Sequence, residues 1–180
     1  MPPDPVDAII KSGNLETTLG RAKIRDNLYA LLATAPDAKT AKKIAGRLEG
    51  IWRRSGSPTV DVLMSRAAKA LKEKKFPRAL KFLDAAVDLA PDYAGGFNRR
   101  AYAHYLAGDL RSAVGDLRRT LALDPNHFRA LDGLATILRE TGQDAAALKT
   151  FDRLLEVHPF ADGAQKAFDN LTDDVKGRGI

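Results

Sequence analysis

Three short stretches of the sequence end alike: residues 87–91 read VDLAP, residues 121–125 read LALDP, and residues 155–159 read LEVHP. Their prolines, Pro91, Pro125 and Pro159, follow one another at a constant spacing of 34 residues. A fixed spacing of this size is typical of a chain built from stacked structural repeats. The spacing therefore predicts three consecutive repeats, over residues 60–93, 94–127 and 128–161.

Other positions keep the same step, and each recurring residue type has a physical reason. An alanine allows two helices to cross closely, a large apolar residue fills the space between repeats, and a glycine permits positive φ in a tight turn. The recurring residues are Ala67, Ala101 and Ala135; Ala79, Ala113 and Ala147; Leu83, Leu117 and Phe151; and Gly108 and Gly142. In the first repeat, residues 74–77 (KKFP) replace the glycine. Each repeat is predicted to hold two helices, both too short to be stable alone.

This period and these residues resemble the tetratricopeptide repeat (TPR) family, whose motif runs W-x2-L-G-x2-Y, then A-x3-F, A and P. The third repeat matches the motif most fully, through Leu131, Leu134, Ala135, Leu138, Ala147, Phe151 and Pro159. Arg66 and Arg100 stand where the family prefers leucine, and Thr120 and Leu154 replace a small alanine. The resemblance covers 102 residues. It implies an all-α fold, an α-solenoid of antiparallel helix hairpins.

The segments before and after the repeats are predicted to be helical as well. Residues 24–57 carry two apolar stripes, separated by Pro36, and Asp37 can cap the second helix. We expect a divergent helical hairpin that stacks on the array, with Trp52 between the hairpin and the first repeat. Residues 162–176 carry a stripe that ends at Val175, which predicts a capping helix. Residues 1–23 are expected to be a partly disordered extension, and residues 177–180 a frayed tail.

Composition narrows the class of protein. The formal charge of +6 is spread along the chain, as in a solvated surface of mixed sign. The sequence has no cysteine, which excludes disulfides and thiolate metal sites. No stretch reaches the roughly 20 apolar residues that cross a bilayer, and the N-terminal residues do not form a secretory signal. We expect a soluble protein, cytoplasmic by default, or periplasmic if a leader was removed before this chain begins.

No motif for catalysis or cofactor binding is found. His104, His127 and His158 lack metal-ligand spacing, and a surface or capping role is favoured for them. The sequence contains no glycine-rich phosphate loop and no nucleophile motif. We therefore expect no enzymatic activity, no cofactor and no metal.

The TPR resemblance implies a site for protein binding. In TPR arrays the first helix of each repeat lines a concave groove, which usually holds the ligand. By register, the groove residues are Met64, Asn98, Tyr102, Tyr105, Arg129, Asp132 and Arg139. Tyrosine and arginine suit such a surface, because one combines apolar area with a polar tip and the other binds carboxylates. The alternative for Tyr102 and Tyr105 is packing against a neighbouring helix.

One use of the family's groove is the carboxylate clamp that grips acidic chaperone C-termini. The clamp positions fall at Met64, Ala68, Arg99, Arg129 and Gly133. Only Arg129 provides the required base at its position. The sequence therefore disfavours chaperone tails as the partner.

Two alternatives to the groove remain open. The first is a basic adaptor that binds an acidic partner or nucleic acid through Lys69, Lys72, Lys74, Lys75, Arg78 and Lys81. The period of 34 residues disfavours RNA binding, because RNA-binding helical repeats of related architecture usually have 35. The second is self-association into a homo-oligomer.

Overall fold

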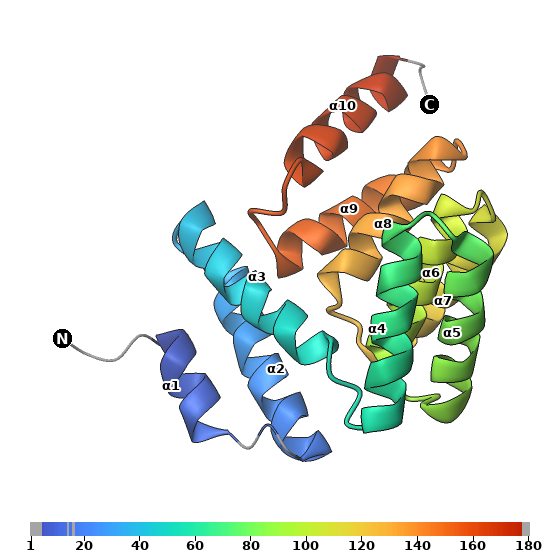
Figure 1. Ribbon diagram of the computed structural model, residues 1–180. Coiled ribbons are helices and arrows are strands. Elements are labelled where there is room, and N and C mark those ends of the chain that lie inside the picture. The colour runs from blue at the N-terminus through green and yellow to red at the C-terminus, as the bar shows by residue number, and fades with distance from the viewer. Residues whose placement is uncertain (1–4, 14, 16, 178–180) are drawn as a thin grey trace.

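The computed structural model describes residues 5–13, 15 and 17–177, which contain ten α-helices and no strand (Figure 1). The first three helices precede the repeats, the next six form them, and the last one follows them. The helices are α1 (Pro5–Ser12), α2 (Thr18–Ala33), α3 (Ala38–Trp52), α4 (Pro58–Lys72), α5 (Phe76–Leu89), α6 (Ala94–Leu106), α7 (Leu110–Leu123), α8 (Phe128–Glu140), α9 (Asp144–Val157) and α10 (Ala164–Gly177).

The helices of the three repeats pack in pairs, α4 with α5, α6 with α7 and α8 with α9, and each pair packs on the next. Alanines at the predicted crossings, Ala79, Ala113 and Ala147, are fully buried. Leu83 and Phe151 are buried at the equivalent inner positions of the second helices. These residues exclude water between helices that could not persist alone. The predicted all-α repeat array is confirmed.

The turn inside each repeat uses a left-handed residue at the same position. Gly108 has φ 82° and Gly142 has φ 71°. Lys74 occupies this position in the first repeat and adopts φ 56°, a conformation that costs a residue with a β-carbon about 1–2 kcal/mol. The geometry of the turn is therefore kept even where the glycine is not.

Arg100, which departs from the family motif, makes a polar contact between two repeats. Its Nε and Nη2 donate to the two carboxylate oxygens of Asp116, each at 2.8 Å, and its Nη1 donates to Asp84 Oδ1 at 3.0 Å. Asp116 is buried, and Asp84 belongs to the preceding repeat. Arginine can hold two carboxylates in this way because its donors are fixed in one plane.

The N-terminal hairpin stacks on the array, and its apolar face packs on the third repeat. Trp52, expected between the hairpin and the first repeat, instead stacks on His127 and packs against Phe128. The side chains of Ile24, Leu28 and Leu48 are buried in one core with Phe128 and Phe151. Figure 1 shows α2 and α3 beside α8 and α9, while α4 and α5 lie on the other side of the molecule. Their contact removes apolar side chains of both the hairpin and the third repeat from water.

A buried polar contact accompanies this core. The Tyr29 hydroxyl of α2 donates to Asp124 Oδ2 at 2.8 Å, and Arg25 Nε lies 4.0 Å from Asp124 Oδ1. Only 2% of Asp124 is exposed, and burial raises the pKa of its carboxyl group. The positive charge of Arg25 and the hydrogen bond from Tyr29 act against this rise, since both favour the charged carboxylate.

The N-terminal end of the chain is more helical than the sequence predicted, and a helix is found where the C-terminal capping helix was predicted. The expected extension over residues 1–23 contains α1 and the start of α2, because Val6 is buried on the hairpin and Thr17 caps α2 through the N–H of Gly20. The C-terminal helix α10 packs on α9 through Ala164 and Leu171. Residues 1–4 and 178–180 lie outside the described part. Within the described part, no helix is long and apolar enough to cross a membrane.

Candidate functional site

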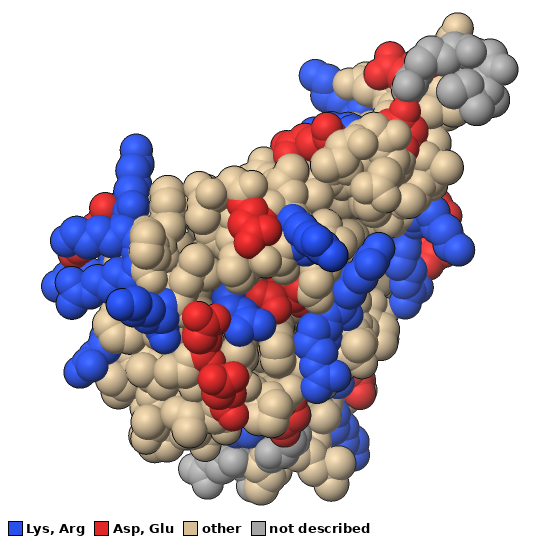
Figure 2. Space-filling model, turned by 90° about the vertical axis from the view of Figure 1, so that its right-hand side faces the viewer, with Lys and Arg blue, Asp and Glu red and all other residues tan. Residues whose placement is uncertain are grey.

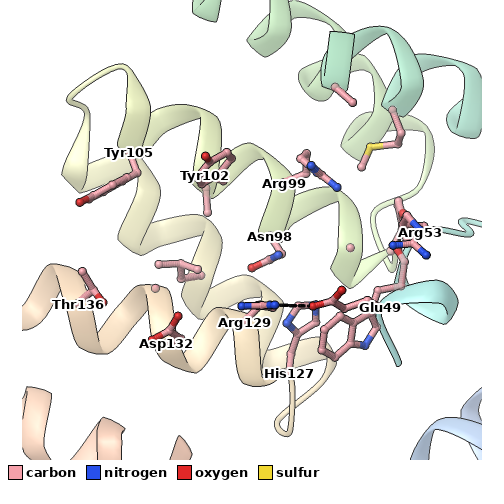
Figure 3. Close-up of a pocket in the computed structure, with 18 of the residues that line it drawn as sticks. Glu49, Arg53, Asn98, Arg99, Tyr102, Tyr105, His127, Arg129, Asp132 and Thr136 are labelled. Carbon is pink, nitrogen blue, oxygen red and sulfur yellow. Dashed lines mark hydrogen bonds and ion pairs between the residues drawn. The ribbon is translucent and has the colours of Figure 1, made fainter. Parts of the chain in front are cut away.

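A cavity of about 700 Å³ opens between the first helices of the repeats (Figure 3). Helices α4, α6 and α8 line its sides, and the C-terminal end of α3 lines its edge. We call this cavity the groove. Its volume falls in the range of ligand pockets, roughly 300–1,000 Å³.

Helix α6 contributes two tyrosines and an amide to the groove. Tyr102 is 52% exposed, and neither its side chain nor that of Asn98 makes a hydrogen bond within the described residues. Tyr105 is half-buried, and its hydroxyl donates to Glu140 Oε1 at 3.0 Å, which raises the pKa of Tyr105. Tyr102 thus faces the groove, whereas Tyr105 also packs against the core of the second repeat.

Helix α8 contributes charged groups. Arg129 donates through Nε and Nη2 to Glu49 Oε1 of α3, at 2.9 and 2.7 Å. Asp132, one turn further along α8, points into the groove and makes no hydrogen bond or ion pair with the described residues. Burial raises the pKa of the Asp132 carboxyl, while Arg129 and Arg139 act in the opposite direction.

The end of α3 is held at the groove by aromatic contacts. The Trp52 indole stacks on the His127 imidazole, with ring centroids 3.7 Å apart and planes 14° from parallel. The Tyr93 hydroxyl donates to the Trp52 carbonyl oxygen at 2.6 Å. His127 Nδ1 accepts a hydrogen bond from the Ala130 N–H and so caps α8. Capping was one of the two roles that the sequence favoured for this residue. Burial lowers the pKa of His127 to about 3, so the imidazole is neutral at physiological pH.

Six of the seven groove residues predicted from the register line the groove: Met64, Asn98, Tyr102, Tyr105, Arg129 and Asp132. Arg139 does not, because it lies at the far end of α8 and lines a separate cavity of about 460 Å³ beside α10. Glu49, Trp52 and Arg53 were missed. Nothing in the repeat pattern indicates that a segment outside the repeats reaches the groove. Trp52, the single tryptophan, was the only residue near the end of α3 that the sequence analysis singled out.

The predicted basic patch lies away from the groove, at the corner between α4 and α5. Its six members are exposed, and Lys75 pairs with Glu73 at 2.8 Å. Figure 2 shows lysine and arginine side chains gathered toward one edge of the molecule and mixed with acidic ones elsewhere. The role of this basic patch in binding an acidic partner or nucleic acid stays a prediction.

Comparisons with known proteins agree with the fold. A tetratricopeptide repeat model matches residues 104–168. A TPR repeat-containing protein of Rhizobium etli is 39% identical over 152 residues, which are 84% of this chain and 74% of that protein. The SGT1 homolog of Bos taurus is 38% identical over 82 residues, 46% of this chain and 24% of that protein.

Among solved structures, the first TPR of Spaghetti (RPAP3) bound to the HSP90 peptide SRMEEVD has a TM-score of 0.64 and 20% identity, over 67% of this chain and 95% of that chain. The complex of the TPR2B domain of yeast Sti1 with an Hsp70 peptide has a TM-score of 0.58 and 24% identity, over 68% and 99%. Both of these TPR domains bind chaperone peptides, so they lend no support to the expectation that chaperone tails are disfavoured as the partner. The identity to the Rhizobium protein, the matched model and the shared fold lead to one conclusion: the chain belongs to the tetratricopeptide repeat family.

Proposed function

We propose that this protein is an interaction module that holds a peptide or an extended protein segment in the groove. One observation carries the proposal. Asn98, Tyr102, Asp132 and Thr136 face each other across the groove from α6 and α8, and none has a hydrogen-bond partner within the described residues. Polar groups in a partly desolvated cavity gain free energy when a ligand supplies the missing partners.

The side chains suit a polypeptide ligand. The Asn98 amide has both donors and an acceptor, so it can pair with the N–H and C=O of a peptide backbone. The exposed ring of Tyr102 offers rigid apolar area with a polar tip, a combination enriched at binding hot spots. The peptide ligands of the two TPR neighbours support the same class of partner.

The proposal is for binding without catalysis. Ser65 is a hydroxyl that lines the groove, and it makes no hydrogen bond to a histidine or carboxylate among the described residues. A serine nucleophile needs an adjacent base. His127, the imidazole at the groove, is buried, and its Nδ1 is already used to cap α8.

A narrower question is whether chaperone tails are the ligand. We propose that they are not, because Arg129, which alone provides the base that its clamp position requires, is already paired with Glu49 at 2.7 Å. A ligand carboxylate would have to displace Glu49, and this competition weakens binding. The HSP90 peptide SRMEEVD is the probe for this point. Submicromolar binding of SRMEEVD that is lost in Arg129→Ala would contradict this part of the proposal.

The experiment selects random displayed 12-residue peptides on the full chain and measures their affinity by fluorescence anisotropy. The double variant Asn98→Ala/Tyr102→Ala should weaken the selected peptides at least tenfold, about 1.4 kcal/mol. Leu89→Ala, which removes an exposed apolar side chain on α5 outside the groove, is the matched control and should leave affinity unchanged. Equal affinities for the double variant and the wild type, with unchanged circular dichroism, would sink the groove assignment.

A further inference from the structure

Acidic and basic side chains both line the groove, but not all of them pair with one another. The acidic groups are Glu49, Asp61 and Asp132, and the basic groups are Arg53, Arg99 and Arg129. His127 adds no positive charge, since burial lowers its pKa to about 3.

Two of the three carboxylates are already used inside the protein. Glu49 accepts from Arg129, at 2.7 Å. Asp61 accepts from the N–H and the hydroxyl of Ser55, at 2.9 and 2.6 Å, in the turn before α4. Asp132 is the remaining carboxylate, and it has no hydrogen-bond or ion-pair partner in the described part of the chain.

The surroundings of Asp132 favour a cation. The carboxyl group is half-buried on α8 and points across the groove toward α6 (Figure 3). Arg129 and Arg139 are the cations that act on the Asp132 carboxyl, but neither forms an ion pair with it. Arg129 pairs with Glu49, and Arg139 lines the other cavity. A partly desolvated carboxylate gains more from an opposite charge than an exposed one does.

The unpaired cations stand at the other side of the groove. Arg53 follows the last residue of α3 and Arg99 lies near the start of α6, and neither guanidinium forms a hydrogen bond or ion pair with a described residue. A ligand of uniform negative charge would meet these arginines but would be repelled at Asp132. The pattern is complementary to a segment with a basic side chain at one point.

We propose that the groove recognises a peptide segment that carries a lysine or arginine, whose side chain inserts beside Asp132. This inference rests on the proposed function and names the chemistry of its ligand. The peptide lies over Asn98 and Tyr102, and its basic side chain reaches Asp132 from the α6 side. A metal ion is a poor alternative occupant, because no group of three or more potential ligands occurs among the described residues.

The test uses the same displayed peptides, selected on wild-type protein. Selected peptides should share a lysine or arginine at one aligned position. Replacing that residue by norleucine, which keeps the aliphatic chain and removes the charge, should weaken binding to the wild type at least tenfold. The same replacement should change binding to Asp132→Asn less than threefold, since that variant has lost the partner charge.

Two controls make the result specific. Asp152→Asn removes an exposed carboxylate on α9, outside the groove, and should behave as the wild type does. Asp132→Lys should instead favour peptides with glutamate at the aligned position. Groove-dependent peptides with no shared basic residue, or an equal norleucine penalty in wild type and Asp132→Asn, would overturn this inference alone. Failure to select any peptide that depends on Asn98 and Tyr102 would contradict the proposed function, and this inference with it.

Discussion

At the scale of single residues, His127 links folding to the groove. It caps α8, stacks on Trp52 and is fully buried, so one imidazole fixes the start of α8 and the end of α3 together. The sequence placed His127 at a turn between repeats and favoured a surface or capping role, of which the structure shows capping and a buried side chain. It could not show the stack, because Trp52 is distant in sequence and no repeat position specifies it.

The burial of His127 makes stability depend on pH. Its pKa is about 3 in the folded protein, against 6.5 for an ordinary histidine. Between these values the unfolded chain binds a proton that the folded chain does not, so stability is complete above pH 6.5 and falls as the pH decreases toward 3. Between pH 7 and pH 5, urea unfolding should show a loss of about 2 kcal/mol from this group.

The variant His127→Asn isolates the effect, because asparagine keeps a good helix cap and does not titrate. The variant should be less stable than the wild type at pH 7, with a smaller loss on acidification. An identical pH dependence in both proteins would show that His127 is not the buried titrating group.

Lys74 is a second position where one residue decides a local property. Its φ of 56° matches the glycines at the equivalent turns, so Lys74→Gly should raise the free energy of unfolding by up to about 1 kcal/mol. In the matched change, Gly108→Ala, the added methyl meets no atom within 4 Å, so its expected cost of about 1 kcal/mol is backbone strain alone. Thermal unfolding measures both; destabilisation by Lys74→Gly would refute the strain at this turn.

At the scale of elements, the repeat period predicted α4 to α9 and the face of each helix that is buried. It worked because a fixed step places alanines and large apolar residues at the same crossings in every repeat. The hairpin of α2 and α3 has no such partner in the pattern. An apolar stripe indicates that one face of a helix is buried, but it does not indicate which element packs on that face. Here the third repeat packs on the hairpin.

The packing of the hairpin on the third repeat predicts a long-range effect. Leu28 of α2 is fully buried, so Leu28→Ala should cost about 2–5 kcal/mol. Amide hydrogen exchange should accelerate in α8 and α9 as well as in α2. Leu83→Ala, a comparable truncation in the separate core formed by α4, α5 and α6, should act mainly on those three helices. Unchanged protection of α8 and α9 in Leu28→Ala would contradict the shared core.

At the scale of the whole molecule, the hairpin completes both the core and the groove. The repeats provide three sides of the groove, and the end of α3 adds Glu49, Trp52 and Arg53 at its edge. The sequence therefore predicted six of the residues that the repeats supply to the groove and missed Glu49, Trp52 and Arg53, which tertiary packing brings in. The charge pattern of the groove depends on that packing, since Glu49 takes up Arg129 and leaves Asp132 without a partner.

The central claim is that a peptide lies in the groove between α4, α6 and α8. The most direct measurement is photo-cross-linking of a selected, labelled peptide to full-length protein that carries benzoylphenylalanine in place of Met64, which lines the groove, or in place of Leu89, which is exposed outside it. The account predicts cross-linked product from position 64, suppressed by excess unlabelled peptide, and none from position 89. Product from position 89 but not from position 64 would contradict it.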